Sequence, residues 1–425
     1  MAASQSHRTE GMPSIFTPVL NFTHHGFQTH SMSLGNPIVV IGGGAAGMLA
    51  AWKAASLGAR VLLLERNSKL GIKLLISGGG KCNITHSGSM ETLLAAFTAR
   101  EARFLKPSFH AFSHRAIMDM LEAKGVKTFV RPDGRVFPIS GKAHDVVDAL
   151  SAYLDEVGVE VWLNTRVQTM CSMGGAVCGV ACDDKEIVTS HVVLATGGAS
   201  YAKTGTTGDG YRWAAALGHT IVPIMPALAP LRIAPPLPAH WRGVARRDGM
   251  LMVFARGRKL AEWRGDILFS HEGITGPAAL EVSRVAARAL GQGAVELRFD
   301  FFPTKDFKHV DDELQRVLFS QREKMIASIL DVWLPNRIVP SLLQAAEVEP
   351  GKRCYVLTRE ERRRIVGLLK SWKMGDVVEV PLDRGEVTAG GVALSEVDPK
   401  TMRSRVVRSL YVYGEVLDVA GPVGG

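Results

Sequence analysis

Apolar residues cluster in a short run at Ile38–Ile41, where all four positions are isoleucine or valine. Such a run is typical of a parallel strand that is buried on both faces. A glycine-rich turn follows it. Residues 48–57 then read as a helix that Gly58 ends, and residues 60–64 read as a second strand that ends at Glu65. This order of strand, turn, helix and strand predicts an α/β fold with a Rossmann-like domain.

Two later segments have the same strand-like character. Residues 192–198 read as a strand that runs into a glycine turn, and residues 411–418 read as a strand that ends in two acidic residues. Between them, residues 251–254 and 295–299 have the partly alternating pattern of strands. The intervening region therefore predicts a second, partly β domain.

A helix in this region carries a basic face. Residues 359–372 have an amphipathic pattern that predicts a helix, with Arg362, Arg363 and Arg364 on its solvent side. Upstream, six prolines between Pro223 and Pro238 predict a loop rather than a helix.

The chain has 425 residues, which is more than one ordinary core accommodates, so two or three domains are expected. We expect residues 37–210 and 376–425 to form one discontinuous Rossmann-like domain, and residues 211–375 to form an inserted substrate or cap domain. Residues 1–36 show little periodicity. They predict a disordered tail, or an extension ahead of a natural start near Met32.

The turn after the first strand has chemistry as well as shape. It spells Gly42-Gly-Gly44-Ala-Ala-Gly47, and Glu65 follows Gly44 by 21 positions. The first glycine of such a turn makes the bend, the second lets the backbone approach a pyrophosphate, and the third lets helix and strand pack closely. An acid at this distance can accept the ribose hydroxyls of adenosine and disfavours a 2′-phosphate. Strand, turn, helix, strand and acid together predict a dinucleotide site that does not take NADP.

Charge is concentrated in the predicted insert. Residues 211–375 carry 26 lysines and arginines against 17 acidic residues, so the whole net charge of +9 falls within them. A basic region can bind an acidic substrate, nucleic acid or an anionic membrane, or can be a solvated face. No basic run is interleaved with the aromatic residues that base stacking needs, so stable nucleic-acid binding is not expected.

Cysteine usage and hydropathy restrict the location. The five cysteines are odd in number and thinly spread, which argues against a disulfide framework and for a reducing compartment, the cytoplasm. Cys178 and Cys182 lack a second pair of ligands, so no metal site is expected. Residues 31–52 lack charge, but their glycines and Pro37 favour a strand and turn over a membrane span.

A second glycine-rich segment favours a flavin site over a nicotinamide site. It runs from Leu70 through Ser77-Gly-Gly-Gly-Lys81-Cys82-Asn83, where an NAD domain would continue into alternating strands and helices. Here the chain resembles the BaiN-like NAD(P)/FAD-dependent oxidoreductases, also described as aminoacetone-oxidase-family FAD-binding flavoproteins. The resemblance continues in the blocks at residues 134–140, 195–201, 205–211, 269–277, 388–392 and 411–418, and so covers nearly everything from residue 37 onward.

This resemblance implies an FAD-binding domain and an oxidoreductase activity. Together with the fingerprint, it implies that FAD contacts Gly42, Gly44, Ala45, Ala46, Gly47, Glu65, Arg66, Lys73, Ser77, Gly79, Cys82, Asn83, Val167, Thr196, Gly197, Gly198, Asp209, Gly414, Glu415 and Asp418.

The chain departs from the family pattern at a few places. Ala202 replaces a usual proline, Lys81 a usual arginine, and Arg408-Ser409 a usual Pro-Gly pair. Family members also continue past Gly425 into a helix whose N-terminus points at the flavin carbonyl. We therefore expect this chain to lack that helix.

Candidates for chemistry beyond the cofactor are few. His271 is the best candidate for a proton donor, Lys81 and Lys73 can hold a phosphate or the reduced ring, and Arg135 and Tyr201 can orient a carbonyl or carboxylate. A structural histidine and solvated lysines are the alternatives. Cys82 has no second cysteine nearby, so it reads as a packing residue.

The expected function is hydride transfer between FAD and a small organic substrate, such as an amine, a ketone or an enone. Only one complete nucleotide fingerprint is present, so NAD(P)H would act as a transient reductant without its own Rossmann unit. The alternatives are a flavoprotein that acts on RNA, suggested by the basic insert, and a non-catalytic or truncated flavoprotein.

Overall fold

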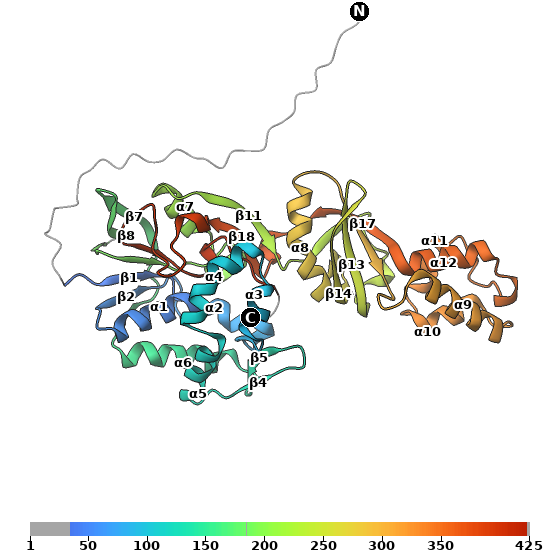
Figure 1. Cartoon of the computed structure of the whole chain (residues 1–425), viewed down its shortest axis with the longest axis horizontal. Helices are drawn as coiled ribbons and strands as arrows, with labels where there is room; N and C mark the ends of the chain where they lie inside the picture. The colour runs from blue at the N-terminus through green and yellow to red at the C-terminus, as the bar shows by residue number, and fades with distance from the viewer. Residues whose placement is uncertain (1–34, 184, 423–425) are drawn as a thin grey trace, which may run out of the picture. The chain divides into compact units, whose positions relative to one another are not determined.

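A computed structural model of the chain describes residues 35–183 and 185–422 (Figure 1). The extension predicted for residues 1–36 lies outside the described residues, except for Gly35 and Asn36. None of the described helices is long and apolar enough to cross a membrane.

A parallel five-stranded sheet forms the first part of the fold and confirms the predicted Rossmann-like α/β class. Its strands β19, β10, β1, β2 and β6 lie in this order and span Leu410–Val412, Val192–Leu194, Ile38–Ile41, Val61–Leu64 and Glu160–Trp162. Alternate residues face opposite sides. Val40 and Leu63 pack with α1 (Ala45–Ser56) and α6 (Ala143–Glu156). Val39 and Leu62 pack on the other face with a β-hairpin over residues 167–182 and with helix α7 (Asp209–Ala216).

Several predicted boundaries shift in the structure. Strand β1 has the expected bounds, and α1 begins three residues earlier than predicted because Gly44 is its extended N-cap residue. The strand predicted over residues 411–418 is wrong beyond Val412. Gly414 has a φ of 80°, which turns the chain out of the strand and into a short 3₁₀ helix.

Short helices and small sheets surround the parallel sheet. The helices are α2 (Ile72–Gly80), α3 (Met90–Ala95), α4 (Ala99–Ala111), α5 (His114–Ala123) and α7 (Asp209–Ala216). The small sheets contain β3 (Thr85–His86), β4 (Thr128–Val130), β5 (Arg135–Pro138), β7 (Val167–Met173), β8 (Ala176–Cys182) and β9 (Glu186–Val188). Helix α2 is interrupted at Ser77–Gly79, where two glycines take positive φ, so this segment is a bent loop as its glycines predicted.

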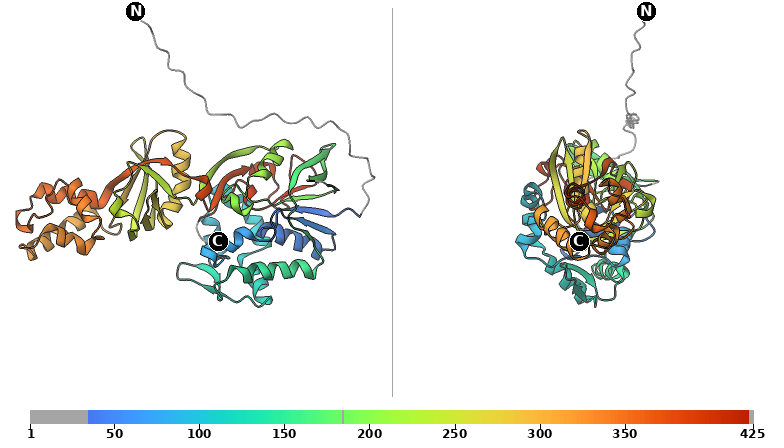
Figure 2. Two further views of the ribbon diagram at one scale, coloured as in Figure 1. Left: turned by 180° about the vertical axis from the view of Figure 1, so that it is seen from behind. Right: turned by 90° about the vertical axis from the view of Figure 1, so that its right-hand side faces the viewer.

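A closed β-barrel follows a two-stranded ribbon. The ribbon pairs β11 (Ile221–Ala227) with β18 (Val387–Val392) in antiparallel fashion. The barrel contains β12 (Leu231–Ala234), β13 (Ala245–Ala255), β14 (Arg258–Phe269), β15 (Gly273–Thr275), β16 (Val295–Asp300) and β17 (Trp372–Glu379). Helix α8 (Pro277–Leu290) packs along the barrel (Figures 1 and 2). The predicted inserted β region is therefore present and more regular than its sequence pattern suggested.

Four helices continue from the barrel: α9 (Phe307–Ser320), α10 (Ile326–Trp333), α11 (Val339–Ala345) and α12 (Arg359–Ser371). Helix α12 was predicted one residue too long, because Trp372 already belongs to β17. The prediction that Arg362 faces solvent is also wrong. Its Nε donates to Asp311 Oδ1 of α9 at 2.8 Å, while Arg363 and Arg364 are exposed.

Buried apolar residues show which segments share a core. The core of the barrel and the four helices is built from residues between Ala229 and Val380. Tyr211 and Trp213 pack instead in the core under the parallel sheet. The domain limits 211 and 375 stay a prediction, and the packing places α7 and β11 with the Rossmann-like part.

Candidate functional site

A cavity of about 370 Å³ lies at the carboxyl ends of β1, β2 and β10, beside the first turn of α1. Ligands of open parallel sheets bind at this edge. The walls come from segments that are far apart in the chain. The predicted cofactor residues among its lining are Gly42, Gly44, Ala45, Ala46, Glu65, Arg66, Lys73, Ser77, Val167, Thr196, Gly197, Asp209, Gly414 and Glu415.

The three fingerprint glycines have the three different environments that a pyrophosphate turn requires. Gly42 has a φ of 107°, and a Cβ there would lie 2.5 Å from the Ala195 carbonyl oxygen. A Cβ on Gly47 would lie 1.8 Å from the Gly42 oxygen, so helix and turn touch at this point. A Cβ on Gly44 would meet nothing within 4 Å. Gly44 therefore leaves its side of the cavity open to a ligand.

Glu65 is a buried carboxylate that backbone and side-chain amides hold in place. Its Oε2 accepts the Gly43 N–H at 2.6 Å, and its Oε1 accepts the Asn67 backbone N–H at 2.8 Å and the Asn67 side-chain amide at 2.7 Å. Within the described part of the chain it has no cationic partner. A carboxylate offers about four acceptor positions, so one remains for a ribose hydroxyl at the cavity wall.

A second polar atom of the wall also fits a nucleotide. The Thr196 hydroxyl is buried and has no hydrogen-bond partner in the structure. It lines the same cavity as the open face of Gly44. Buried polar atoms are almost always satisfied, so an unsatisfied hydroxyl in a ligand cavity indicates a partner supplied by the ligand. The residues present therefore fit an adenine dinucleotide.

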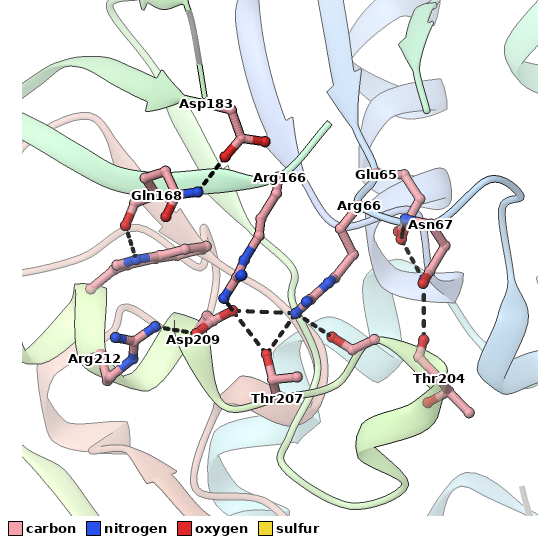
Figure 3. A network of polar contacts seen from close by, with 12 residues as sticks. Glu65, Arg66, Asn67, Arg166, Gln168, Asp183, Thr204, Thr207, Asp209 and Arg212 are labelled. Carbon is pink, nitrogen blue, oxygen red and sulfur yellow. Dashed lines mark hydrogen bonds and ion pairs between the residues drawn. The ribbon is translucent and has the colours of Figure 1, made fainter. Parts of the chain in front are cut away.

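Three arginines surround Asp209 at the Glu65 end of the cavity (Figure 3). Arg66 Nη1 lies 3.3 Å and Arg166 Nη2 lies 3.5 Å from Asp209 Oδ2, and Arg212 pairs with Oδ1. Arg66 also donates to the Thr207 hydroxyl at 2.8 Å. Burial acts to raise the pKa of Asp209, but hydrogen bonds from Thr207 and Arg212 and the arginine charges bring its pKa below the ordinary value. Asp209 thus stays ionised and holds Arg66 and Arg166 beside the cavity.

An ion pair forms another part of the cavity wall. Lys73 Nζ of α2 lies 2.8 Å from Glu415 Oε2, although 342 positions separate them in the chain. Lys73 also donates to the Ser200 hydroxyl at 3.0 Å, and Glu415 Oε1 accepts the Thr388 N–H at 2.7 Å. This network ties α2, the turn after β10, β18 and the C-terminal segment to one another.

The remaining predicted cofactor residues do not line the cavity: Gly47, Gly79, Cys82, Asn83, Gly198 and Asp418. Cys82 is 1% exposed, and burial raises the pKa of its thiol. Asp418 pairs with Arg100 at 3.3 Å. The Asn83 side-chain oxygen is buried without a partner. Contact of these residues with FAD stays a prediction.

The predicted catalytic residues differ in their exposure and in their partners. The His271 side chain is 71% exposed and lies 3.7 Å from Glu272. Lys81 is exposed at the end of α2, and Tyr201 is half-buried in the turn after β10. The substrate-orienting candidate Arg135 forms an ion pair with Asp133 at 2.6 Å. None of these side chains lines the cavity, and their roles stay predictions.

Sequence reasoning missed part of the cavity wall. Asn67, Arg166 and the segment Thr204–Thr207 line it. Asn67 could have been found from its position two residues after Glu65, and Arg166 from its position next to Val167. No cluster of three or more histidine, cysteine or acidic residues with metal-binding geometry occurs among the described residues.

The chain is similar in sequence and fold to several known proteins. The family model described as the HI0933-like protein Rossmann domain matches residues 36–425. A 3-dehydro-bile acid delta(4,6)-reductase of Clostridium scindens is 29% identical over 398 residues, which cover 92% of this chain and 95% of that protein. A ribosomal RNA dihydrouridine synthase of Escherichia coli is 28% identical over 389 residues, which cover 91% and 93%. Among solved structures, the 3-ketosteroid-delta4-(5alpha)-dehydrogenase of Rhodococcus jostii RHA1 is 16% identical with a TM-score of 0.44, covering 91% of this chain and 92% of that one.

Proposed function

The chain belongs to the HI0933-like family, and from this membership we propose that it reduces a carbon–carbon double bond conjugated to a carbonyl group in a small organic substrate. The family match confirms the resemblance drawn from the sequence motifs, and the chain is an FAD-dependent oxidoreductase. The substrate and the use of NAD(P)H as a transient reductant belong to the proposal.

The observation that carries the proposal is the dinucleotide cavity, whose wall contains Glu65 and the Lys73–Glu415 pair. Glu65, Thr196 and the open face of Gly44 would hold the adenosine and pyrophosphate of FAD, and Lys73 would lie toward the rest of the cofactor. When bound, FAD supplies two-electron hydride chemistry. The protein contributes binding, orientation and proton management.

The names of two relatives both describe enzymes whose reaction involves the same type of bond. A delta(4,6)-reductase of a 3-dehydro bile acid acts on double bonds conjugated to a ketone. A dihydrouridine synthase saturates the uracil ring bond that is conjugated to a carbonyl. Such a bond accepts a hydride at the carbon remote from the carbonyl, because the carbonyl oxygen takes up the developing negative charge. This shared chemistry supports an enone-like substrate for the present chain.

The first test is the visible spectrum of the purified protein with FAD, before and after anaerobic addition of NADH or NADPH. We expect flavin bands that bleach with a nicotinamide and return when 2-cyclohexen-1-one, a small ring enone, is added. Bands that bleach but do not return with the enone would point to another acceptor. Bands that persist with both nicotinamides would remove NAD(P)H as the reductant, and no flavin bands would indicate a non-catalytic protein.

RNA is a second candidate substrate, favoured by an exposed surface formed by Phe319, Arg322, Met325, Arg353 and Tyr355, the aromatic–basic surface. Phe319 is 76% and Tyr355 is 52% exposed. The Arg322 guanidinium lies 6.0 Å from the Phe319 ring centre, and the Tyr355 N–H donates to the Arg322 carbonyl. Exposed rings beside cations suit base stacking with phosphate contact. The fold thus combines residues from two segments that sequence inspection had separated.

Fluorescence anisotropy with a short single-stranded RNA tests this candidate. We expect Phe319→Ala combined with Tyr355→Ala to weaken binding at least about 30-fold, since stacking contributes roughly 1–3 kcal/mol per base. Phe112→Ala replaces an exposed ring of the Rossmann-like part and is the matched control. If the unaltered protein binds no RNA even at low salt, the RNA candidate is excluded and the small-molecule proposal stands alone.

We also propose a cytoplasmic location. All five cysteines are free in the structure, and Cys82, Cys182 and Cys354 are buried without a partner thiol. Free buried thiols are typical of proteins kept in a reducing compartment.

A further inference from the structure

A carboxyl group without a partner lies beside the flavin-binding network. Glu386 stands between a 3₁₀ turn (Leu382–Arg384) and β18. Its backbone is fixed, because its N–H donates to Leu228 O at 3.1 Å and its carbonyl accepts the Ser200 hydroxyl at 3.4 Å. Its carboxyl group forms no hydrogen bond or ion pair with the residues that the structure describes, and the residue is exposed.

The surroundings of Glu386 are those of a proton-holding group. Burial by the protein around it raises the pKa of this carboxyl, although the charges of Arg135 and Lys73 oppose the shift. Both cations are already neutralised: Arg135 by Asp133 at 2.6 Å and Lys73 by Glu415 at 2.8 Å. A carboxylic acid whose pKa is raised is a better-placed proton donor than an ordinary surface carboxylate.

Tyr201 places a second free protic group near Glu386. Its pKa is raised by burial and by the nearby Glu386 charge. The backbone of Tyr201 has a φ of 53°, a left-handed conformation that is unfavourable for a tyrosine. Its carbonyl oxygen compensates by accepting the Thr204 N–H at 2.7 Å and the Thr204 hydroxyl at 2.8 Å. The Tyr201 hydroxyl has no hydrogen-bond partner in the described part of the chain, so it is free to bind a ligand.

Thr388 links the segments that carry both groups to Glu415 of the cavity wall. The Thr388 hydroxyl accepts the N–H groups of Ala199 at 2.8 Å and Ser200 at 3.1 Å. Thr388 N–H in turn donates to Glu415, which holds Lys73 of the cavity wall. Hydrogen bonds therefore join the segment of Tyr201 to the segment of Glu386, and the bonded residues lie within two positions of each.

We propose that Glu386 is the catalytic proton donor of the reduction and that the Tyr201 hydroxyl binds the carbonyl oxygen of the substrate. The inference rests on the proposed function. Saturating a conjugated double bond adds two electrons and two protons, which is one hydride and one proton. The hydride delivered to the remote carbon brings both electrons and one hydrogen, so one proton must still reach the carbon next to the carbonyl. Glu386 Oε–H supplies that proton, and the resulting carboxylate takes another from solvent.

Other groups fit this role less well. Cys82 is 1% exposed and cannot reach a substrate. His271, the donor expected from the sequence, lies 3.7 Å from the Glu272 carboxylate, so its ring has an ionic partner that the Glu386 carboxyl lacks. Lys73 is engaged by Glu415 and Ser200. Glu386 combines solvent access, a free carboxyl and a fixed backbone.

The kinetic test uses the FAD-loaded full chain and follows the return of the flavin bands after NAD(P)H reduction, with 2-cyclohexen-1-one as acceptor. We expect Glu386→Gln to retain FAD and to bleach normally, but to slow the return at least about 100-fold, the scale of general acid catalysis. Glu386→Asp should recover at least about a tenth of the rate. Glu262→Gln, which alters an exposed glutamate of β14, should change nothing.

A second readout needs no substrate or cofactor. A carboxyl whose pKa is raised by folding favours the folded state below its ordinary value of 4.5 and loses that contribution as pH rises through the raised pKa. We therefore expect Glu386→Gln to raise the urea unfolding midpoint relative to the unaltered protein at neutral pH, and to leave it unchanged near pH 4.

The outcomes separate the two proposals. If the unaltered protein bleaches with NAD(P)H but no enone restores the bands, the proposed function fails, and the catalytic role of Glu386 fails with it, even where the pH-dependent stability difference is present. If the bands return and Glu386→Gln stays within threefold of the unaltered rate, only the role of Glu386 is overturned. A midpoint difference that is the same at both pH values also overturns it.

Discussion

At the scale of single residues, the fingerprint glycines are not equivalent. The added Cβ of Gly47 would collide with the Gly42 carbonyl oxygen at 1.8 Å, whereas that of Gly44 would enter open space at the cavity. One position is therefore constrained by the fold and the other by the ligand.

This difference predicts opposite effects for one substitution. Gly47→Ala should lower the free energy of unfolding by about 3 kcal/mol, as overpacking against backbone does. Gly44→Ala should unfold like the unaltered protein but bind FAD at least about tenfold more weakly, because the methyl group occupies the approach to the pyrophosphate. Urea unfolding and FAD titration measure the two effects. Equal loss of stability in both variants would contradict this assignment.

Single residues also show what the sequence could reveal. The position of Glu65 after the second strand was sufficient to place it at the cavity. The unpaired carboxyl of Glu386 had no such signal, because its environment comes from Arg135, Lys73 and Tyr201 on other segments. The position of His271 outside the cavity lining is likewise decided by tertiary contacts that the sequence does not display.

At the scale of elements, one buried acid joins three segments. Glu101 in the first turn of α4 accepts the Thr98 backbone N–H and hydroxyl as a capping box, and its other oxygen lies 2.8 Å from Arg284 Nη2 of α8. That same oxygen accepts the Ala420 N–H at 3.2 Å. Burial acts to raise the pKa of Glu101, but the Arg284 and Thr98 hydrogen bonds hold it below the ordinary value.

We expect Glu101→Ala to cost about 3–5 kcal/mol of unfolding free energy, the usual loss when one partner of a buried ion pair is removed. Because the folded pKa is lowered, this stabilisation is present above the ordinary carboxyl pKa and is lost as pH falls through the folded value. Urea unfolding at neutral and acidic pH measures both. Glu91→Ala, an exposed first-turn acid of α3, is the control. A loss that does not shrink toward acidic pH would contradict the ion-pair explanation.

Element types were predictable where local pattern dominates. The β1 run and the α1 helix follow from burial on both faces and from the fingerprint turn. The early end of β19 depends on the positive φ of Gly414, and the end of α12 depends on Trp372 pairing with Phe299 in the barrel. Such boundaries are decided by tertiary contacts, which a single sequence does not display.

At the scale of the whole molecule, cofactor binding should couple to stability, because the cavity joins segments from residue 41 to residue 415. Free FAD at about 100 times its Kd should add about 2.7 kcal/mol to the free energy of unfolding. NADP⁺ at the same concentration should add nothing, since Glu65 disfavours a 2′-phosphate. Thermal unfolding with each ligand measures this, and equal stabilisation by both would contradict the assignment of Glu65.

The general architecture was accessible from sequence, but its closure was not. A second, partly β part was expected from residues 251–254 and 295–299, whereas the closed barrel requires β12 and β17 to pair across more than a hundred positions. Pairing at that separation leaves no local pattern. The four-helix continuation likewise depends on packing with the barrel core.

The β11–β18 ribbon has a consequence for descent. Ala227 and Val387 are ladder partners, so the chain leaves the Rossmann-like part and re-enters it at adjacent points. No residue between these two lines the dinucleotide cavity. Replacing the segment between these two points would therefore exchange one insert for another without altering a residue of the cavity wall. The cofactor site and the insert can thus change independently of each other during evolution.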